Sequence, residues 1–352
     1  MSVAWATEIR RDPKSFVELS EWWDRQQAVL DCPFLHSGIL GRWKPEFERP
    51  NGGLQLRLLK RDGELVAALP LYRARGLAYT LSRNHADWID VVAIDDEEVR
   101  AYLPRWLNSV AMAYLHGFRE DSPVVAAASE HPRWVVQKEL PSPYVDLSQG
   151  IEAVRSGWSR NFHRSLRRRR RRLEELGPVT YVDHPRPEEI EQVLNKGLRI
   201  EVAGWKGRKG VAVLNRPDYE HWYRSLAQVA QDKGWLRLSA LYLDQRMLSF
   251  SFDLQYGKRR FTQLSGYDED IAGSLSTGSL LLEEIIGRSV SDGLESYEFG
   301  FGAERWKQDW TKRERRVFDL LVFGAGGAGR ALAAARRVKK RRSLAHSAGA
   351  DQ

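Results

Sequence analysis

The stretch WLRLSALYLDQRMLSFSFDLQYGKRRFTQLSGY, residues 235–267, decides the fold. It holds three runs of strand length, Trp235–Leu243, Met247–Tyr256 and Arg259–Tyr267. The polar pair Asp244-Gln245 marks a tight turn between the first two. Short connections of this kind join antiparallel neighbours, so the stretch predicts a three-stranded antiparallel meander.

Helical patterns lie on both sides of this meander. They cover Pro187–Ala203 and about Pro217 to Lys233 before it, and Thr277–Ser291 after it. Further strands are expected at Val179–Asp183, Ser296–Gly300 and Arg316–Phe323, the last of which closes the sheet. This order of elements predicts an α+β fold, with a mixed but mainly antiparallel sheet flanked by helices.

The first half of the chain repeats the plan. Leu54–Leu59 and Leu65–Tyr72 flank a turn at Asp62-Gly63, and this hairpin aligns with the later one, with Asp62 over Asp244. Other elements expected in this half are helices at Pro13–Leu30 and Glu97–His116 and strands at Trp88–Ile94 and Pro123–Ala128. One matched hairpin indicates a duplicated unit.

The length agrees with two domains. The chain has 352 residues, and a domain has roughly 150. The segment PSPYVDLS, Pro141–Ser148, breaks the pattern and predicts a linker. We therefore expect domains at residues 1–148 and 149–323, followed by a flexible basic tail at 324–352.

Positive charge is concentrated in two places. The formal net charge is +8, of which residues 324–352 carry +6, from seven Lys or Arg and one acid. The segment Arg155–Arg172 holds nine arginines and no acid. Such patches attract phosphates or anionic lipid surfaces, so two interpretations of the tail stay open: contact with an anionic membrane surface, or a disordered, solvated segment. Positive charge alone does not recognise a particular base sequence, and we expect no specific nucleic-acid binding.

The sequence has no secretory signal or apolar run long enough for a membrane span, which predicts a cytoplasmic protein. Its single cysteine, Cys32, excludes an internal disulfide, and we expect no metal site. The motifs G-x-S-x-G, H-E-x-x-H and G-x-x-x-x-G-K-[ST] are absent. Nucleophile-elbow hydrolases, zincins and P-loop nucleotide-binding proteins are therefore disfavoured.

Three segments stand out as candidate sites. In Glu201–Gly210 a helix ends in a basic, glycine-rich loop bearing Trp205, although a helix C-cap alone explains Gly204 and Lys206. In Tyr267–Ser279 a strand leads into a helix whose start has free N–H groups, which suits an anion or an ordinary N-cap. Glu298–Trp310 is a charged, Trp-rich loop after a strand, where either a site or a plain connection is expected.

Together these segments resemble the CelD-like group of GNAT-superfamily acyltransferases, which are relatives of the Fem-type peptidyltransferases. The resemblance covers about Ser159 to Phe323. The matching motifs are an Arg-rich helix ending in Leu-x-x-x-Gly (Leu173–Gly177), Glu-x-x-x-Trp-Lys-Gly-x-x-Gly (Glu201–Gly210), Tyr-Asp-Glu (Tyr267–Glu269), and aromatic-Gly-x-Gly (Phe299–Gly302) before Lys307 and Trp310. It implies two tandem GNAT-like domains, of which the first is degenerate.

The resemblance implies transfer of an acyl group from acyl-CoA, such as acetyl-CoA, to an amine of a sugar, amino acid or envelope or exopolysaccharide precursor. The implied acid, base or amine-positioning residues are Glu201, Tyr267 and Asp268. The donor diphosphate is expected at Ser274, Ser276, Thr277, Gly278 and Ser279. The acceptor is expected to contact Trp205, Lys206, Gln263, Lys307 and Trp310. No tightly bound cofactor is expected.

The sequence departs from the group at two positions. The lysine common before Tyr-Asp-Glu is Leu264, and the usual Ser-Pro-Gly at the helix start is Ser276-Thr277-Gly278. The first change keeps open a degenerate module that binds partners of polysaccharide synthesis without catalysis. A Fem-type transferase using aminoacyl-tRNA is a further alternative, since Arg155–Arg172 suits tRNA phosphates.

Overall fold

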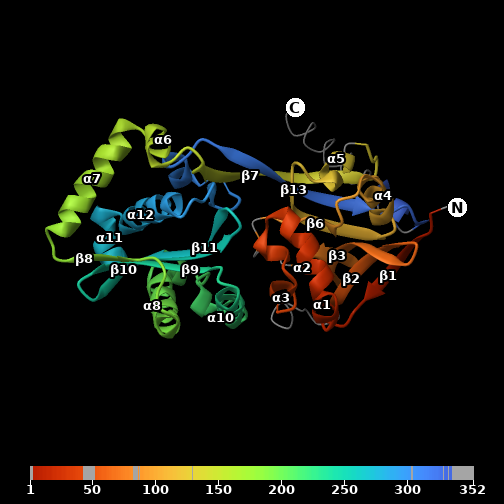
Figure 1. The fold of residues 1–352 in the computed structure, drawn as a ribbon, viewed down its shortest axis with the longest axis horizontal. Coiled ribbons are helices and arrows are strands. Elements are labelled where there is room, and N and C mark those ends of the chain that lie inside the picture. The colour runs from red at the N-terminus through yellow and green to blue at the C-terminus, as the bar shows by residue number, and fades with distance from the viewer. Residues whose placement is uncertain are drawn as a thin grey trace, which may run out of the picture. The chain divides into compact units, whose positions relative to one another are not determined.

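The computed structural model describes residues 3–42, 52–81, 86, 88–128, 130–302, 304–327, 329–331 and 333–334. Residues 272–274 are described in their backbone only. The chain forms two compact units (Figure 1). Unit 1 contains residues 1–41, 48–140 and 316–352, and unit 2 contains 42–47 and 141–315. Each unit is described by itself.

Unit 2 is built on the predicted meander. Strands β9 (Leu236–Leu243), β10 (Arg246–Tyr256) and β11 (Arg259–Tyr267) pair antiparallel in sequence order, which confirms the prediction. Strand β8 (Val179–Val182) pairs antiparallel with β9 at one edge. On the other side β12 (Ser296–Glu298) runs parallel to β11 and pairs antiparallel with the end of β7 (Trp134–Asp146).

Helices cover both faces of this sheet. Helices α8 (Ile190–Ala203) and α10 (Pro217–Asp232) lie on one face, and α12 (Thr277–Ser291) lies on the other (Figure 1). Helix α12 has the predicted bounds. The remaining helices of the unit are α6 (Ile151–Ser156), α7 (Arg160–Glu174), α9 (Trp205–Arg208), α11 (Glu269–Leu275) and the 3-10 turns η3 (Pro187–Glu189), η4 (Val213–Asn215) and η5 (Arg305–Asp309).

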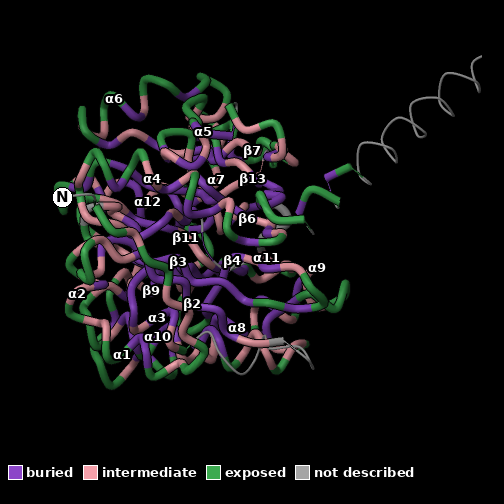
Figure 2. The backbone as a smooth tube through the Cα atoms, turned by 90° about the vertical axis from the view of Figure 1, so that its right-hand side faces the viewer, coloured by how far each residue is buried: buried purple, intermediate pink, exposed green. Residues whose placement is uncertain are grey.

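Unit 1 has a second mainly antiparallel sheet. Its order is β1 (Trp5–Arg10), β2 (Gly52–Arg61), β3 (Glu64–Ala74), β4 (Leu77–Thr80), β6 (Met112–Arg119) and β13 (Glu314–Phe323), with β5 (Val92–Ala93) beside β3. Its helices are α1 (Ser15–Glu18), α2 (Ser20–Gln27), α3 (Ser37–Leu40), α4 (Glu97–Leu107) and α5 (Pro123–Ala128), with 3-10 turns η1 (Ala28–Leu30) and η2 (Pro33–Leu35). Burial is greatest along the strands (Figure 2).

The two hairpins that align in the sequence turn in the same way. Asp62, between β2 and β3, has φ = 52°, and Asp244, between β9 and β10, has φ = 51°. Aspartate tolerates this left-handed conformation better than most residues. Together with the two sheets, this agrees with an α+β fold of two tandem GNAT-like units.

Two element predictions in unit 1 are wrong. Pro123–Ala128 is the helix α5, not a strand, because its alanines favour a helix and the Ser122 hydroxyl accepts a bond from the Val124 N–H at 3.2 Å. The helix expected over Glu97–His116 ends at Leu107, and Met112–Arg119 forms strand β6.

The unit boundaries also differ from the predicted ones. The expected linker Pro141–Ser148 overlaps strand β7, and the units divide at Leu140 and Pro141. Arg316–Phe323 belongs to unit 1, not to the second unit: it is hydrogen-bonded to β7 on one side and pairs antiparallel with β6 on the other. This pairing joins segments about 200 residues apart, which no local pattern reveals. The basic residues 336–342 of the expected tail lie outside the described residues.

Candidate active site

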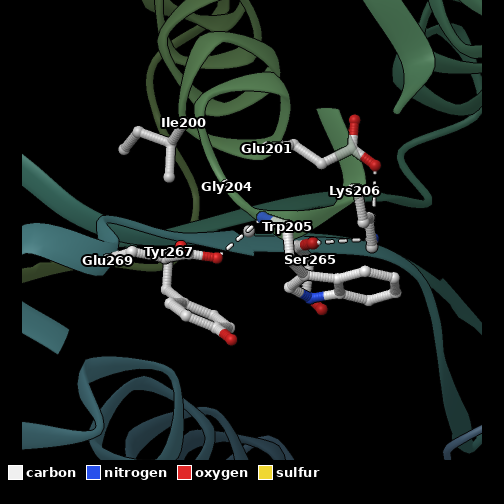
Figure 3. A pocket seen from close by; sticks show the side chains of 9 residues that line it. Ile200, Glu201, Gly204, Trp205, Lys206, Ser265, Tyr267 and Glu269 are labelled. Carbon is white, nitrogen blue, oxygen red and sulfur yellow. Dashed lines mark hydrogen bonds and ion pairs between the residues drawn. The ribbon is translucent and has the colours of Figure 1, made fainter. Parts of the chain in front are cut away.

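A pocket opens where β11 ends against α8 and α9. Its empty volume is about 210 Å³, including the open mouth. The lining residues are Ile200, Glu201, Gly204, Trp205, Lys206, Ser265, Gly266, Tyr267 and Glu269 (Figure 3). Two of the sequence motifs, Glu201–Gly210 and Tyr267–Glu269, therefore meet in one place.

Glu201 supplies a buried carboxylate from the last turn of α8. Its side chain is only 2% exposed. One carboxylate oxygen lies 3.2 Å from the Lys206 Nζ, and the other accepts the Val213 N–H at 2.9 Å. Lys206 also donates to the Ser265 carbonyl at 3.0 Å (Figure 3). Each carboxylate oxygen has a second lone pair, so Glu201 can still accept a hydrogen from a bound amine.

Glycines allow the backbone to approach closely around this carboxylate. A Cβ at Gly266 in β11 would lie 3.1 Å from the Glu201 Cα and N. A Cβ at Gly207 would lie 1.7 Å from the Val202 carbonyl oxygen. Only glycine fits at position 207, and a side chain at position 266 would require Glu201 to shift by a few tenths of an ångström, so both glycines help to set the corner between α8 and α9.

Helix α8 ends at Ala203, as predicted, and Trp205 lies beyond its end. The backbone leaves the helical conformation at Gly204, where ψ is −165°, and Trp205 begins the short helix α9. Glu201 and Trp205 both line the pocket, and the Trp205 side chain is exposed there (Figure 3).

Glu269 is a pocket residue that the sequence analysis did not select. Its carboxylate accepts the Trp205 N–H at 2.7 Å and pairs with Arg208 at 2.8 Å. The hydrogen bond from Arg208, together with the Trp205 N–H, lowers the pKa of Glu269. The Tyr-Asp-Glu motif, of which Glu269 is the last residue, was the sequence signal that could have identified it. Its partner Trp205 is 64 residues away in the sequence, so no local pattern reveals their hydrogen bond.

Tyr267 links the pocket to the start of α12. Its residue is 40% exposed, and its ring lines the pocket. A Cβ at Gly278 would lie 3.8 Å from the Tyr267 Cδ1, so the ring is a van der Waals neighbour of the first turn of α12. The pocket and the start of α12, which are the candidate acceptor and donor sites, therefore meet at Tyr267.

The first turn of α12 has the features expected of an anion site. Its N-cap Ser276 has φ = 48° and makes no side-chain cap hydrogen bond. The Ser279 N–H donates to the Ser276 carbonyl at 2.8 Å, so the first-turn N–H groups for which the helix itself offers no acceptor are those of Thr277 and Gly278. The Thr277 hydroxyl is buried and donates to the Leu248 carbonyl at 3.2 Å, so it shapes the turn and does not face a ligand. Gly278 and Ser279 are partly exposed, and the side chain of Ser274 lies outside the described residues.

Gln263 is the extra residue of a β-bulge in β11. Phe252 pairs with Leu264 and Asp253 pairs with Thr262, which leaves Gln263 without a register partner. Its carbonyl accepts the Tyr223 hydroxyl at 3.2 Å. Bulges often re-aim side chains next to active sites. Gln263 does not line the pocket, however, and Leu264, at the place of the family lysine, is buried in the core.

Three other predicted site residues lie outside this pocket. Asp268 pairs with Arg246 at 2.6 Å. Lys307 is buried by its own loop, paired with Glu304 at 2.8 Å and bonded to the Gly300 carbonyl at 3.3 Å. Trp310 is 4% exposed and packs its ring edge-on against Trp158 and Phe162. The structure thus gives Lys307 and Trp310 a packing role in place of the expected substrate contact.

Among the described residues, no group of three or more His, Cys, Asp or Glu is placed to hold a metal ion. No helix of the described chain is long and apolar enough to cross a membrane.

One family model matches most of the second unit. Residues 160–308 match the family model of the acetyltransferase (GNAT) domain. No curated protein sequence matches the chain significantly.

Solved structures share the fold over nearly the whole chain at low identity. The C-terminal domain of a putative lysylphosphatidylglycerol synthetase from Agrobacterium fabrum is 14% identical with a TM-score of 0.55, covering 91% of this chain and 95% of that one. FemX is 10% identical with a TM-score of 0.54, covering 93% and 96%. A conserved protein of unknown function from Bacteroides thetaiotaomicron is 12% identical with a TM-score of 0.57, covering 90% and 100%. These likenesses show that the chain shares the fold of these proteins.

Proposed function

We propose that the GNAT domain of this chain, residues 160–308, transfers an acyl group from acyl-CoA to an amine. The observation that carries the proposal is the meeting of three features: the buried carboxylate of Glu201, the exposed ring of Tyr267 and the start of α12. Amine acylation needs a group that takes a proton, a group that returns one, and a site for the donor's phosphates.

The donor is proposed to bind across the first turn of α12. The N–H groups of Thr277 and Gly278 and the positive end of the helix dipole favour the diphosphate of CoA. The thioester then lies toward Tyr267, whose ring neighbours Gly278. This arrangement leads the acyl carbon from the helix start toward the pocket.

The acceptor amine is proposed to bind in the pocket beside Glu201. The amine nitrogen attacks the thioester carbon, and the carbon–sulfur bond breaks. Glu201 takes the amine proton, directly or through one water, and the Tyr267 hydroxyl protonates the departing thiolate. Lys206 holds the Glu201 carboxylate in place and offers its charge to an anionic group of the acceptor.

The exposed Trp205 indicates the class of acceptor. Residue Trp205 is 42% exposed at the pocket, and the Lys209 ammonium lies over one face of its ring, 5.2 Å from the ring centre. Exposed indole rings stack on the apolar faces of sugars. We therefore favour an amino sugar, as found in envelope or exopolysaccharide precursors, over a small aliphatic amine.

Isothermal titration with acetyl-CoA and octanoyl-CoA tests the donor site. Gly278→Asp places a carboxylate in the first turn of α12, where like charge repels phosphate, and we expect its Kd to rise at least tenfold. Gly287→Asp is the matched control, because a Cβ there meets nothing within 4 Å and the position is distant from the helix start. Failure of both thioesters to bind the wild type at millimolar concentration contradicts the proposal.

A further inference from the structure

One face of α7 carries a row of arginines that the proposed chemistry does not use. The exposed members, called here the arginine face, are Arg160, Arg164, Arg167, Arg168, Arg171 and Arg172. They extend about 18 Å along the helix and cover about 140° of its circumference. Among the described residues, only Arg171 of this set pairs with an acid, Glu175 at 3.5 Å.

The opposite face fixes α7 beside the proposed donor site. Leu166 and Leu173 are buried in the same hydrophobic core as Leu275, which immediately precedes the N-cap of α12. Arg170, outside the arginine face, pairs with Glu283 of α12 at 2.8 Å. Helix α7 therefore lies against α11 and α12, as Figure 1 shows, and directs the arginine face outward.

The donor site itself lacks cationic side chains. No Lys or Arg occurs between Arg260 and Arg288, a stretch that includes β11 after its first residues, α11 and nearly all of α12. Arg246, in the neighbouring strand β10, is paired with Asp268 and Asp270. The N–H groups at the start of α12 can hold a phosphodiester or the diphosphate of CoA, but this stretch offers no cationic side chain for the further ribose phosphate of CoA. The positive charge lies on α7 instead.

We infer that the acyl donor is delivered by an acidic acyl carrier protein that docks on the arginine face. This inference rests on the proposed acyl transfer. A carrier protein presents the same pantetheine thioester as CoA but attaches it through a single phosphodiester. Its acidic surface complements the arginines, whose mutual repulsion along α7 is relieved by the docked partner.

The surroundings of α7 favour a protein partner over RNA or a membrane. Proteins that bind single-stranded RNA stack bases on exposed aromatic rings, but Trp158 and Phe162 pack into the core against Trp310. Helices that bind at a membrane surface insert an apolar face, but the apolar face of α7 is buried.

Binding measurements on the full chain test this inference. The probes are octanoyl-CoA and an octanoyl-loaded acyl carrier protein. For the wild type we expect the carrier to bind about tenfold more tightly than octanoyl-CoA at low ionic strength, with the difference lost in high salt. The variant Arg164→Glu/Arg168→Glu/Arg171→Glu should weaken the carrier at least tenfold and change octanoyl-CoA less than twofold.

A charge-matched control separates docking from net charge. Lys233, Lys258 and Lys312 are exposed in unit 2 outside α7. The variant Lys233→Glu/Lys258→Glu/Lys312→Glu makes the same change in total charge and should bind both donors like the wild type. If the arginine variant does not fold, Arg164→Gln/Arg168→Gln/Arg171→Gln replaces it, with the same direction expected.

The outcomes distinguish this inference from the proposed function. Octanoyl-CoA binding without carrier binding, or equal carrier binding by both charge variants, overturns the docking inference and leaves the proposed function standing. Loss of both donors in the wild type contradicts the proposed function itself. Tighter binding of a short RNA duplex or of anionic phosphatidylglycerol vesicles, abolished by the arginine variant, assigns the face to that partner and also overturns the inference.

Discussion

Glu201 is held in place by partners on two sides. Its buried carboxylate faces the Lys206 ammonium and the Val213 N–H. Burying a charge is costly unless such partners satisfy it, so the carboxylate and its partners depend on one another. The same contacts hold the loop after α8, and the shape of the pocket depends on this residue as well as its chemistry.

Replacing Glu201 should therefore affect stability. We expect Glu201→Ala to lower the free energy of unfolding by about 2 kcal/mol, because the Val213 N–H and the Lys206 ammonium lose their acceptor. Glu201→Gln, which keeps an oxygen acceptor, should cost less. Urea unfolding measures both. A loss below about 0.5 kcal/mol for the alanine variant would show that the contacts do not stabilise the fold.

Tyr267 offers a test that separates chemistry from binding. Tyr267→Phe removes only the hydroxyl, while the ring still contacts the start of α12. We expect the rate constant for acyl transfer to an amino-sugar acceptor to fall about a hundredfold, in the range of general acid catalysis. The Kd for the donor should stay within twofold. An unchanged rate would exclude Tyr267 as the proton donor.

Helix α8 is set against the sheet by a glycine in its middle. Gly197 lies over β10, where an added Cβ would be 2.4 Å from the Phe250 ring. Gly287 is also a glycine inside a helix, α12, but an added Cβ there would meet nothing within 4 Å. Alanine substitution at Gly287 therefore tests helix propensity alone, whereas at Gly197 it tests helix propensity together with close packing.

Alanine substitution at these glycines should give opposite signs. Gly287→Ala should raise the free energy of unfolding by about 0.5–1 kcal/mol, because alanine loses less backbone entropy in a helix. Gly197→Ala should lower it by about 1–3 kcal/mol, because the ring and the helix must move apart. Thermal unfolding compares the two variants. Stabilisation by Gly197→Ala would mean that α8 is not packed as described.

Sequence patterns predicted these elements where the signal is local. The meander and helices α8, α10 and α12 follow from periodicity and turns within one segment. The pocket residues Glu201, Trp205, Lys206 and Tyr267 lie in two short motifs, so their selection needed no knowledge of packing. Lys307 and Trp310 stood in an equally conspicuous motif, but their burial depends on side chains of distant segments, such as Trp158. No spacing rule reveals that contact.

On the scale of the whole molecule, the chain returns to its first unit after completing most of the second. Strand β13 follows all of unit 2 in sequence yet pairs with β6 of unit 1. The sheet of unit 1 therefore cannot be complete until residue 316 and those after it are available. Long-range pairings of this kind form late, because their loop entropy must be overcome first.

Asp319 of β13 bonds to three groups of the neighbouring strand β6 in unit 1. Its carboxylate pairs with His116 Nδ1 at 2.6 Å and accepts the Gly117 N–H at 3.1 Å and the Tyr114 hydroxyl. Burial raises the pKa of Asp319, but the hydrogen bonds from His116 and Tyr114 outweigh it, and the net pKa is lowered. A carboxyl whose folded-state pKa is lowered stabilises the fold above its unfolded pKa, near 3.9, and that stability is lost as the pH falls through the folded value.

The substitution Asp319→Asn should therefore destabilise unit 1 at neutral pH and much less in acid. We expect a lower Tm than wild type at pH 7, because the amide cannot replace the charged acceptor. The difference should be smaller at about pH 3, below the unfolded pKa, where the stability that comes from the lowered pKa of Asp319 has begun to be lost. Thermal unfolding followed by circular dichroism at both pH values measures the Tm difference. Hydrogen exchange of the β6 amides shows where in the structure the effect lies. A Tm difference that is the same at both pH values would mean that shape, and not the charge of Asp319, attaches β13.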